Sequence, residues 1–168
     1  MPKSSNQSRR SEKIEETIVR SLAGRKQTLA IAESCTGGLI ANRITNVPGA
    51  SEIFSGGIVA YSDGVKKKFL GVRCGTLKTF GAVSEAVARE MAEGARKKFR
   101  ADFAIAVTGI AGPAGGTKTK PVGTVFIALA GAFGTFVEQK SNPFEREKFK
   151  EVTANQALEM LLSRSTQT

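Results

Sequence analysis

Apolar residues along the chain form two patterns. Some recur at the spacing of a helix, and others form short continuous runs. Ile14, Ile18 and Leu22 recur every four residues, which places them on one face of a helix that Gly24 can end. Short apolar runs bounded by turn residues indicate buried strands instead. We expect strands at 28–32, 56–61, 102–108, 122–130 and 135–139, and helices over 14–24, 39–46, 65–70, 85–99 and about 149–161.

The order of these elements predicts the architecture. Helices that alternate with apolar strands are typical of a three-layer α/β/α sandwich. The strand at 102–108 is apolar throughout, as expected when helices cover both faces of a sheet. A hairpin around residues 131–134 would make the sheet mixed. We therefore predict a mixed, mainly parallel sheet of about five strands in a single domain over 11–168, with a disordered tail over 1–10.

The composition excludes several kinds of catalytic site. The 168 residues include no histidine, so neither a Ser-His-Asp triad nor a Cys-His pair can form within the chain. A histidine metal ligand is excluded as well, and we expect neither a metal nor a cofactor. The two cysteines do not make a disulfide framework, which favours a reducing, cytoplasmic compartment.

The net charge of the chain is large, but it does not by itself identify a binding partner. Lysine and arginine total 25 and acidic residues 15, giving a net charge of +10. The positive charge is spread along the chain, and one tyrosine with no tryptophan offers little for base stacking. The sequence therefore argues against nucleic acid as a partner. It also argues against a membrane, because no apolar run approaches the ~20 residues of a membrane span.

Two glycine-rich segments follow predicted strands and carry the candidate chemistry. The first, 34–38 (SCTGG), lies at a strand-to-helix turn, where free backbone N–H groups can hold a phosphate or an oxyanion. The second, 108–117 (TGIAGPAGGT), follows the apolar strand at 102–108. In open α/β sheets, ligands bind beyond the carboxyl ends of strands, so both segments are expected to line one crevice. A plain helix cap at 34–38 and a flexible connection at 108–117 are the alternatives.

A nucleophile in a chain without histidine needs another base. A lysine can serve when burial or neighbouring positive charge lowers its pKa, and Ser–Lys pairs are a known variant of the triad. Lys66, Lys67 and Lys68 all follow a predicted strand end, and the pattern does not choose among them. Ser34 and Cys35 are rival nucleophiles, although a cysteine is often only a small buried apolar residue.

The segments AESCTGGLIANRITNVPGAS, GGIVAYS, FGAVSEAVA and VTGIAGPAGGTKTKPVGTV closely resemble the C-terminal domain of the CinA family. The resemblance covers about residues 14–163, and the two glycine-rich blocks together are highly specific. The family includes stand-alone deamidases of nicotinamide mononucleotide (NMN). The resemblance therefore implies a metal-free amidohydrolase that releases ammonia from NMN, and it also implies a homo-oligomer. A non-catalytic nucleotide-binding or interaction module is the alternative.

The resemblance also assigns roles to particular residues. Ser34 would be the nucleophile and Lys66 its base. Tyr61, Thr108 and Arg146 also fall at positions that the resemblance places at the site. We expect Arg146 to bind the phosphate of the substrate. We also expect backbone N–H groups of Thr36, Gly37 and Gly38, or those of Thr108 and Gly109, to hold the oxyanion. The chain departs from the family pattern at two places: Asp63-Gly64 stands where Asn-Glu is common, and Phe144-Glu145 stands where Gly-Asp is common.

Overall fold

The structure, a computed structural model, describes residues 12–165, so the predicted tail over 1–10 lies outside the described residues. The described chain forms six α-helices, one short 3-10 helix and five strands. The helices are α1 (Ile14–Gly24), α2 (Leu39–Thr45), η1 (Ala50–Glu52), α3 (Asp63–Leu70), α4 (Cys74–Phe80), α5 (Glu85–Phe99) and α6 (Arg146–Ser165). The strands are β1 (Leu29–Glu33), β2 (Phe54–Val59), β3 (Phe103–Gly109), β4 (Thr124–Gly131) and β5 (Gly134–Ser141).

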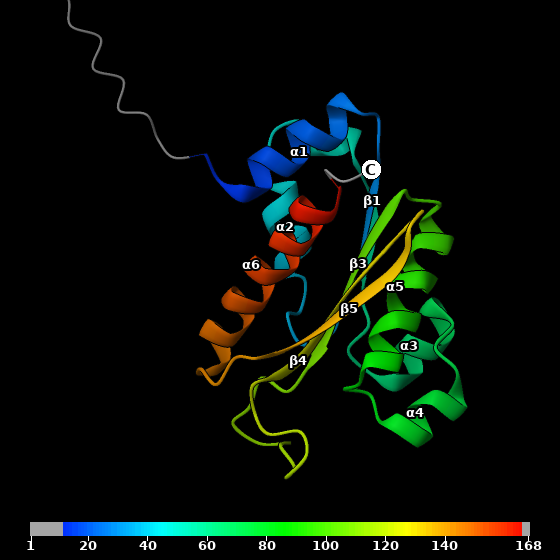
Figure 1. Cartoon of the computed structure of the whole chain (residues 1–168), viewed down its shortest axis with the longest axis vertical. Coiled ribbons are helices and arrows are strands. Elements are labelled where there is room, and N and C mark those ends of the chain that lie inside the picture. The colour runs from blue at the N-terminus through cyan, green and yellow to red at the C-terminus, as the bar shows by residue number, and fades with distance from the viewer. Residues whose placement is uncertain (1–11, 166–168) are drawn as a thin grey trace, which may run out of the picture.

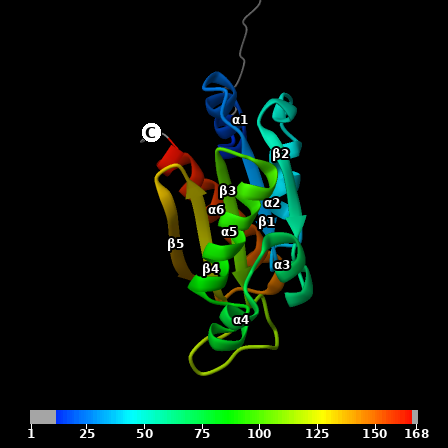
Figure 2. The ribbon, with the colours of Figure 1, turned by 90° about the vertical axis from the view of Figure 1, so that its right-hand side faces the viewer.

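The five strands form one sheet in the order β2-β1-β3-β4-β5. Strand β1 pairs parallel with both β2 and β3, whereas β4 pairs antiparallel with β3 and β5. Four of the five strands therefore point the same way and only β4 opposes them. Figure 2 shows β2 and β5 at the two edges of this sheet. The prediction of a mixed, mainly parallel sheet is confirmed, including the hairpin between β4 and β5.

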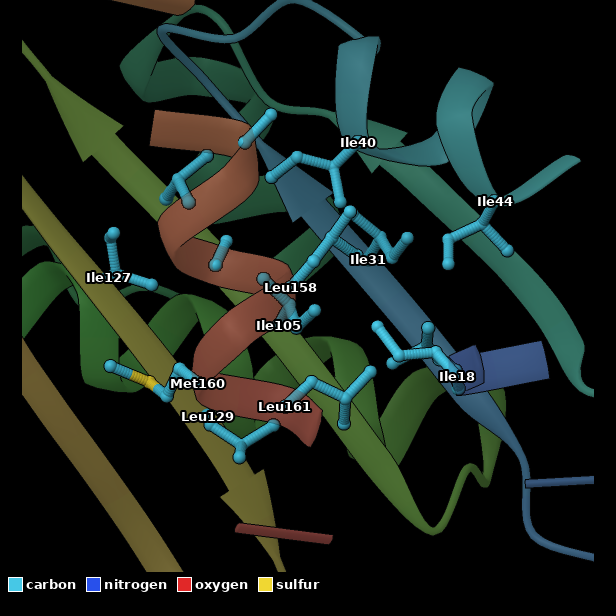
Figure 3. Close-up of a cluster of buried hydrophobic side chains, with 14 of the residues drawn as sticks. Ile18, Ile31, Ile40, Ile44, Ile105, Ile127, Leu129, Leu158, Met160 and Leu161 are labelled. Carbon is cyan, nitrogen blue, oxygen red and sulfur yellow. The ribbon is translucent and has the colours of Figure 1, made fainter. Parts of the chain in front are cut away.

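Helices cover both faces of the sheet, which confirms the three-layer sandwich. Helices α1, α2 and α6 lie on one side and α3, α4 and α5 on the other (Figure 1). Large aliphatic side chains of the strands, such as Ile31, Ile105 and Ile127, point toward the first group, where Figure 3 shows them against Leu158 and Leu161 of α6.

The opposite face of the sheet carries mostly alanines. They alternate with the large residues because successive side chains of a strand point to opposite faces. These small side chains let α5 lie close to the sheet, and α5 contributes small residues in return. The residues of this alanine face are Ala30, Ala32, Ala104, Ala106, Ala128 and Ala130 of the strands, with Ala88, Ala92 and Ala95 of α5. Close approach on this side brings α3, which packs beside α5, within reach of the strand ends.

The predicted elements match the structure with local differences. The helix expected to follow Ser84 is α5, and the Ser84 hydroxyl accepts a hydrogen bond from Val87 N at 3.3 Å, as an N-cap should. Strand β2 covers 54–59 rather than the predicted 56–61, so Tyr61 lies just beyond the strand. Helix α4 and the short η1 were not predicted.

Candidate functional site

A cavity of about 260 Å³ lies where β1 and β3 end. Its lining comes from five segments of the chain that are distant in sequence. These are 34–35 after β1, residues within 61–66, Ala82 and Val83, residues within 108–115, and Arg146 at the start of α6. Figure 1 shows the long loop between β3 and β4 extending from this end of the sheet. Both glycine-rich segments thus reach one crevice, although only the first two residues of 34–38 line it.

Ser34 and Lys66 meet inside this cavity. Lys66 Nζ lies 3.2 Å from Ser34 Oγ, although the two residues are 32 positions apart in sequence. Ser62 caps α3 by accepting a hydrogen bond from Val65 N, and the helix then turns Lys66 and Leu70 to its buried side. Lys67 is exposed, as is Lys68 beside it. The helical turn therefore separates three consecutive lysines that the sequence pattern alone left equivalent.

Burial shifts the protonation equilibrium of Lys66 toward its neutral form. Its side chain is 1% exposed, and burial lowers its pKa, while the Asp63 carboxylate acts in the opposite direction. Lys66 Nζ donates hydrogen bonds to Ala60 O at 2.8 Å and to Tyr61 O at 3.2 Å. None of the ion pairs within residues 12–165 involves Lys66. A lysine held in this way can take a proton from a neighbouring hydroxyl.

Cys35, the rival nucleophile, is made less reactive by its surroundings. Its side chain lines the same cavity but is largely buried, and burial raises the pKa of the thiol to about 12. The thiolate is the reactive form of cysteine, so a thiol with this pKa is a poor nucleophile near neutral pH. The serine beside it, paired with Lys66, is the stronger candidate on these grounds.

Four further residues expected at the site line the cavity: Tyr61, Thr108, Gly109 and Arg146. Arg146 donates through Nη2 to the Tyr61 hydroxyl and through Nη1 to Gly112 O, both at 2.7 Å. It therefore joins the chain after β2 to the long glycine-rich loop. Thr108 is buried and donates to Ala82 O at 2.8 Å, which holds a third segment of the cavity wall.

The structure does not bring Thr36, Gly37 and Gly38 to the cavity. The carboxylate of Glu33 accepts hydrogen bonds from Thr36 Oγ1 at 2.5 Å and from Gly38 N at 3.0 Å, and Gly37 N donates to Ser34 O at 3.1 Å. These donors are used within the turn. The Thr36 hydroxyl and the N–H groups of Gly37 and Gly38 are therefore bonded within the protein, and of this turn only Ser34 and Cys35 line the cavity.

Sequence reasoning missed several residues of the site. Ala82 and Val83 line the cavity but carry no reactive group that would single them out. Asp63 also lines it, at the first position of α3. Glu33 directly precedes the SCTGG turn, and an acidic residue that ends an apolar strand was the available signal for its role.

Residues 12–165 contain no group of three or more histidine, cysteine, aspartate or glutamate side chains that could hold a metal ion. Over the same range, none of the helices combines the length and the apolar character that crossing a membrane requires.

Comparison with known proteins shows the family of the chain. The sequence model of the CinA C-terminal domain matches residues 11–165. A CinA-like protein of Thermotoga neapolitana is 58% identical over 118 residues, which are 70% of this chain and 29% of that protein. A CinA-like protein of Anaeromyxobacter is 48% identical over 150 residues, or 89% of this chain and 37% of that protein. The chain thus spans about a third of the length of these curated relatives.

Solved structures share the fold along most of their length. The competence/damage inducible protein CihA of Agrobacterium tumefaciens superposes with a TM-score of 0.87 at 41% identity, covering 89% of this chain and 92% of that one. The competence damage-inducible protein A (ComA) of Klebsiella pneumoniae gives a TM-score of 0.88 at 34% identity, covering 91% and 95%. Sequence and fold together show that the chain belongs to the CinA family, through its C-terminal domain.

Proposed function

We propose that this chain is an amidohydrolase that converts NMN and water to nicotinate mononucleotide and ammonia. The observation that carries the proposal is the approach of Ser34 Oγ to the buried Lys66 Nζ, at 3.2 Å. A serine hydroxyl beside a lysine of lowered pKa is the Ser–Lys form of an activated nucleophile. The identity of the substrate rests on the family resemblance.

The three hydrogen-bond partners of Lys66 accommodate both forms of the amine. A protonated Lys66 donates to Ala60 O, Tyr61 O and Ser34 Oγ. A neutral amine has two N–H donors and one lone pair. The two donors match the carbonyl oxygens of Ala60 and Tyr61, which leaves the lone pair for the Ser34 hydroxyl proton. An ammonium group would have no lone pair to offer. The three partners therefore suit a general base as well as its later return of the proton.

The reaction proceeds in two balanced halves. Lys66 takes the Ser34 proton as Oγ bonds to the carboxamide carbon, and the protonated Lys66 then gives that proton to the nitrogen as the C–N bond breaks. Ammonia leaves and an acyl ester remains on Ser34. Water attacks this ester, with Lys66 accepting one proton and returning it to Ser34 Oγ, and the product carboxylate departs with release of the other proton.

Arg146 is our candidate for the phosphate of the substrate. Two of its N–H groups already hold the Tyr61 hydroxyl and Gly112 O. A guanidinium has five donors, so others remain for phosphate oxygens. Its position on the cavity wall, together with the long loop, would orient the nucleotide with the carboxamide toward Ser34.

The test is ammonia release from NMN by the purified protein without added metal. We expect release by the wild type, loss of at least about 10³-fold in Ser34→Ala and Lys66→Met, and near wild-type rates in two matched controls. The controls are Ser55→Ala and Lys67→Met, which change exposed residues of the same types. NMN binding without ammonia release by the wild type would contradict the proposal and support the non-catalytic binding module.

A further inference from the structure

Glu33 is the most deeply buried carboxylate among the described residues, with 1% of its surface exposed. It ends β1 and points toward the start of α2. Its Oε2 accepts hydrogen bonds from Thr36 Oγ1 at 2.5 Å, Gly38 N at 3.0 Å and Ile40 N at 3.1 Å. Its Oε1 accepts one from Ala41 N at 2.9 Å. No ion pair within residues 12–165 involves Glu33, so neutral donors alone satisfy this group.

Four hydrogen bonds to one carboxylate make the chain from Glu33 to Ala41 a closed, rigid unit. Bonds to an ionised acceptor are about twice as strong as bonds between neutral groups, and they offset the cost of burying the charge. Gly37 and Gly38 supply the positive φ angles, +63° and +99°, that the tight turn requires. The turn is therefore held by a side chain that lies outside the cavity.

Ser34 lies inside this unit, directly after Glu33. Its N–H donates to Val107 O and its carbonyl accepts from Gly37 N, both at 3.1 Å. These bonds fix its backbone, while the side chain points the other way, toward Lys66. Adjacent residues thus face opposite layers: Glu33 faces α2, and Ser34 faces α3.

We propose that Glu33 is a positioning residue: by holding the turn over 33–41, its carboxylate keeps Ser34 Oγ within hydrogen-bond distance of Lys66 Nζ. The catalytic consequence rests on the proposed function, whereas the geometric consequence does not. A nucleophile displaced by about 1 Å can lose about 10²-fold in rate. Glu33 does not line the cavity, so substrate affinity should depend on it weakly.

The experiment compares Glu33→Gln with Glu15→Gln. Glu15 is the matched control because it is also buried and also bonded to α2, accepting from Arg43 Nη2 at 2.7 Å, but it does not contact the Ser34 turn. Glutamine at position 33 brings an NH₂ group against backbone N–H donors. We expect Glu33→Gln to lower kcat for NMN about 10²-fold per folded molecule with KM little changed, and Glu15→Gln to leave both near wild type.

Crystal structures of the two variants provide a readout that does not depend on activity. In Glu33→Gln we expect Ser34 Oγ to move out of hydrogen-bond distance of Lys66 Nζ, and in Glu15→Gln we expect the 3.2 Å distance to persist. A preserved distance in Glu33→Gln would overturn the proposal, even if the wild type proves inactive on NMN. Equal losses of kcat in both variants, in proportion to their stabilities, would also overturn it.

Should Glu33→Gln fail to fold, Thr36→Val serves as the second variant. It removes only the shortest of the four bonds and preserves the shape of the side chain. We then expect a smaller loss of kcat, about 10-fold, again with KM little changed. An unchanged kcat together with an unmoved Ser34 in this variant would contradict the positioning role.

Discussion

At the scale of single residues, the charge of Asp63 opposes the effect of burial on the pKa of Lys66. Burial lowers the pKa of Lys66, and the negative charge of Asp63 raises it, so the two effects oppose one another. Asp63→Asn removes the opposing charge, and the pKa of Lys66 falls further. In the proposed mechanism neutral Lys66 is the base, so we expect the acidic limb of the pH–rate profile to move to lower pH.

The measurement is kcat/KM for NMN across pH 5 to 10 for wild type, Asp63→Asn and Asp63→Glu. The glutamate variant keeps the charge and is expected to retain the wild-type profile more closely. A shift of the acidic limb to higher pH in Asp63→Asn would show that the sign is wrong. Asp63 is exposed at the first position of α3, so Asp63→Asn is expected to fold.

The two cysteines, Cys35 and Cys74, provide a second prediction at the residue scale. Burial raises the pKa of Cys35 to about 12, whereas Cys74 is exposed. Iodoacetamide at pH 8 should therefore label Cys74 and leave Cys35 unmodified until the protein is unfolded in urea. Peptide mass spectrometry distinguishes the two sites.

The Cys35→Ala variant tests whether Ser34 or Cys35 is the nucleophile. We expect ammonia release within a few-fold of wild type and a loss of about 1 kcal/mol of stability, the usual size for a modest core truncation. Loss of activity in Cys35→Ala with retention in Ser34→Ala would reverse the assignment of the nucleophile.

At the scale of elements, the packing of α3 against α5 depends on Gly94. A Cβ atom built at Gly94 would lie 1.8 Å from Leu70 O and 2.7 Å from Leu70 C, which are backbone atoms at the end of α3. These atoms belong to the helix that carries Lys66. Gly94→Ala must therefore push α3 away from α5, and we expect a loss of about 3 kcal/mol or more in the free energy of unfolding.

Gly75 of α4 is the matched control, because a Cβ atom there meets nothing within 4 Å. Gly75→Ala should stabilise the protein by about 0.4–1 kcal/mol, since alanine loses less backbone entropy in a helix than glycine does. Urea unfolding followed by circular dichroism measures both variants. A Gly94→Ala variant as stable as the wild type would mean that the two helices are less closely packed than the structure shows.

The strength of its local sequence signals determines whether an element can be predicted from the sequence. Helix α5 has a serine cap and a regular apolar face, and β3 is a continuous apolar run, so both patterns were clear. Helix α4 (CGTLKTF) has one buried residue, Thr76, and no side-chain cap, so it offers neither signal. Its position depends on tertiary contacts, including the bond from Thr76 Oγ1 to Glu90 of α5 at 2.8 Å.

The site was predictable only where its residues carry reactive groups or belong to a specific motif. Ser34 and Lys66 came from the motif resemblance, because spacing alone left three lysines and two nucleophiles open. The partners of the glycine-rich turn at 36–38 cannot be predicted from the sequence, since N–H donors look the same there whether a ligand or an internal carboxylate accepts from them. Only the fold reveals that Glu33 takes that place.

At the scale of the whole molecule, the two faces of the sheet differ in what packs against them. The face with large aliphatic residues builds the main core with α1, α2 and α6. The small side chains of the alanine face let α5 pack close to the sheet. Because α3 packs against α5, α3 also lies close to the carboxyl ends of the strands. Burying a lysine on this second side costs stability, because the unfolded chain can hydrate the charge and the folded chain cannot.

That cost predicts how stability depends on pH. The pKa of Lys66 is lower in the folded protein than in the unfolded chain, where a lysine titrates near 10.4. Between these two values the unfolded chain binds more protons, so the free energy of unfolding rises with pH. Lys66→Met removes this dependence. The stability of the wild type relative to Lys66→Met should therefore increase through the alkaline range, by at most about 1.4 kcal/mol per pH unit.

Urea unfolding of wild type, Lys66→Met and Lys67→Met at several pH values between 7 and 10.5 measures the effect. Lys67 is exposed, so Lys67→Met should follow the wild-type curve and serve as the control. Curves for wild type and Lys66→Met that stay parallel across the range would mean that Lys66 keeps its ordinary pKa on folding. In that case the amine would remain charged at neutral pH, and it could not accept the Ser34 proton there without first losing its own.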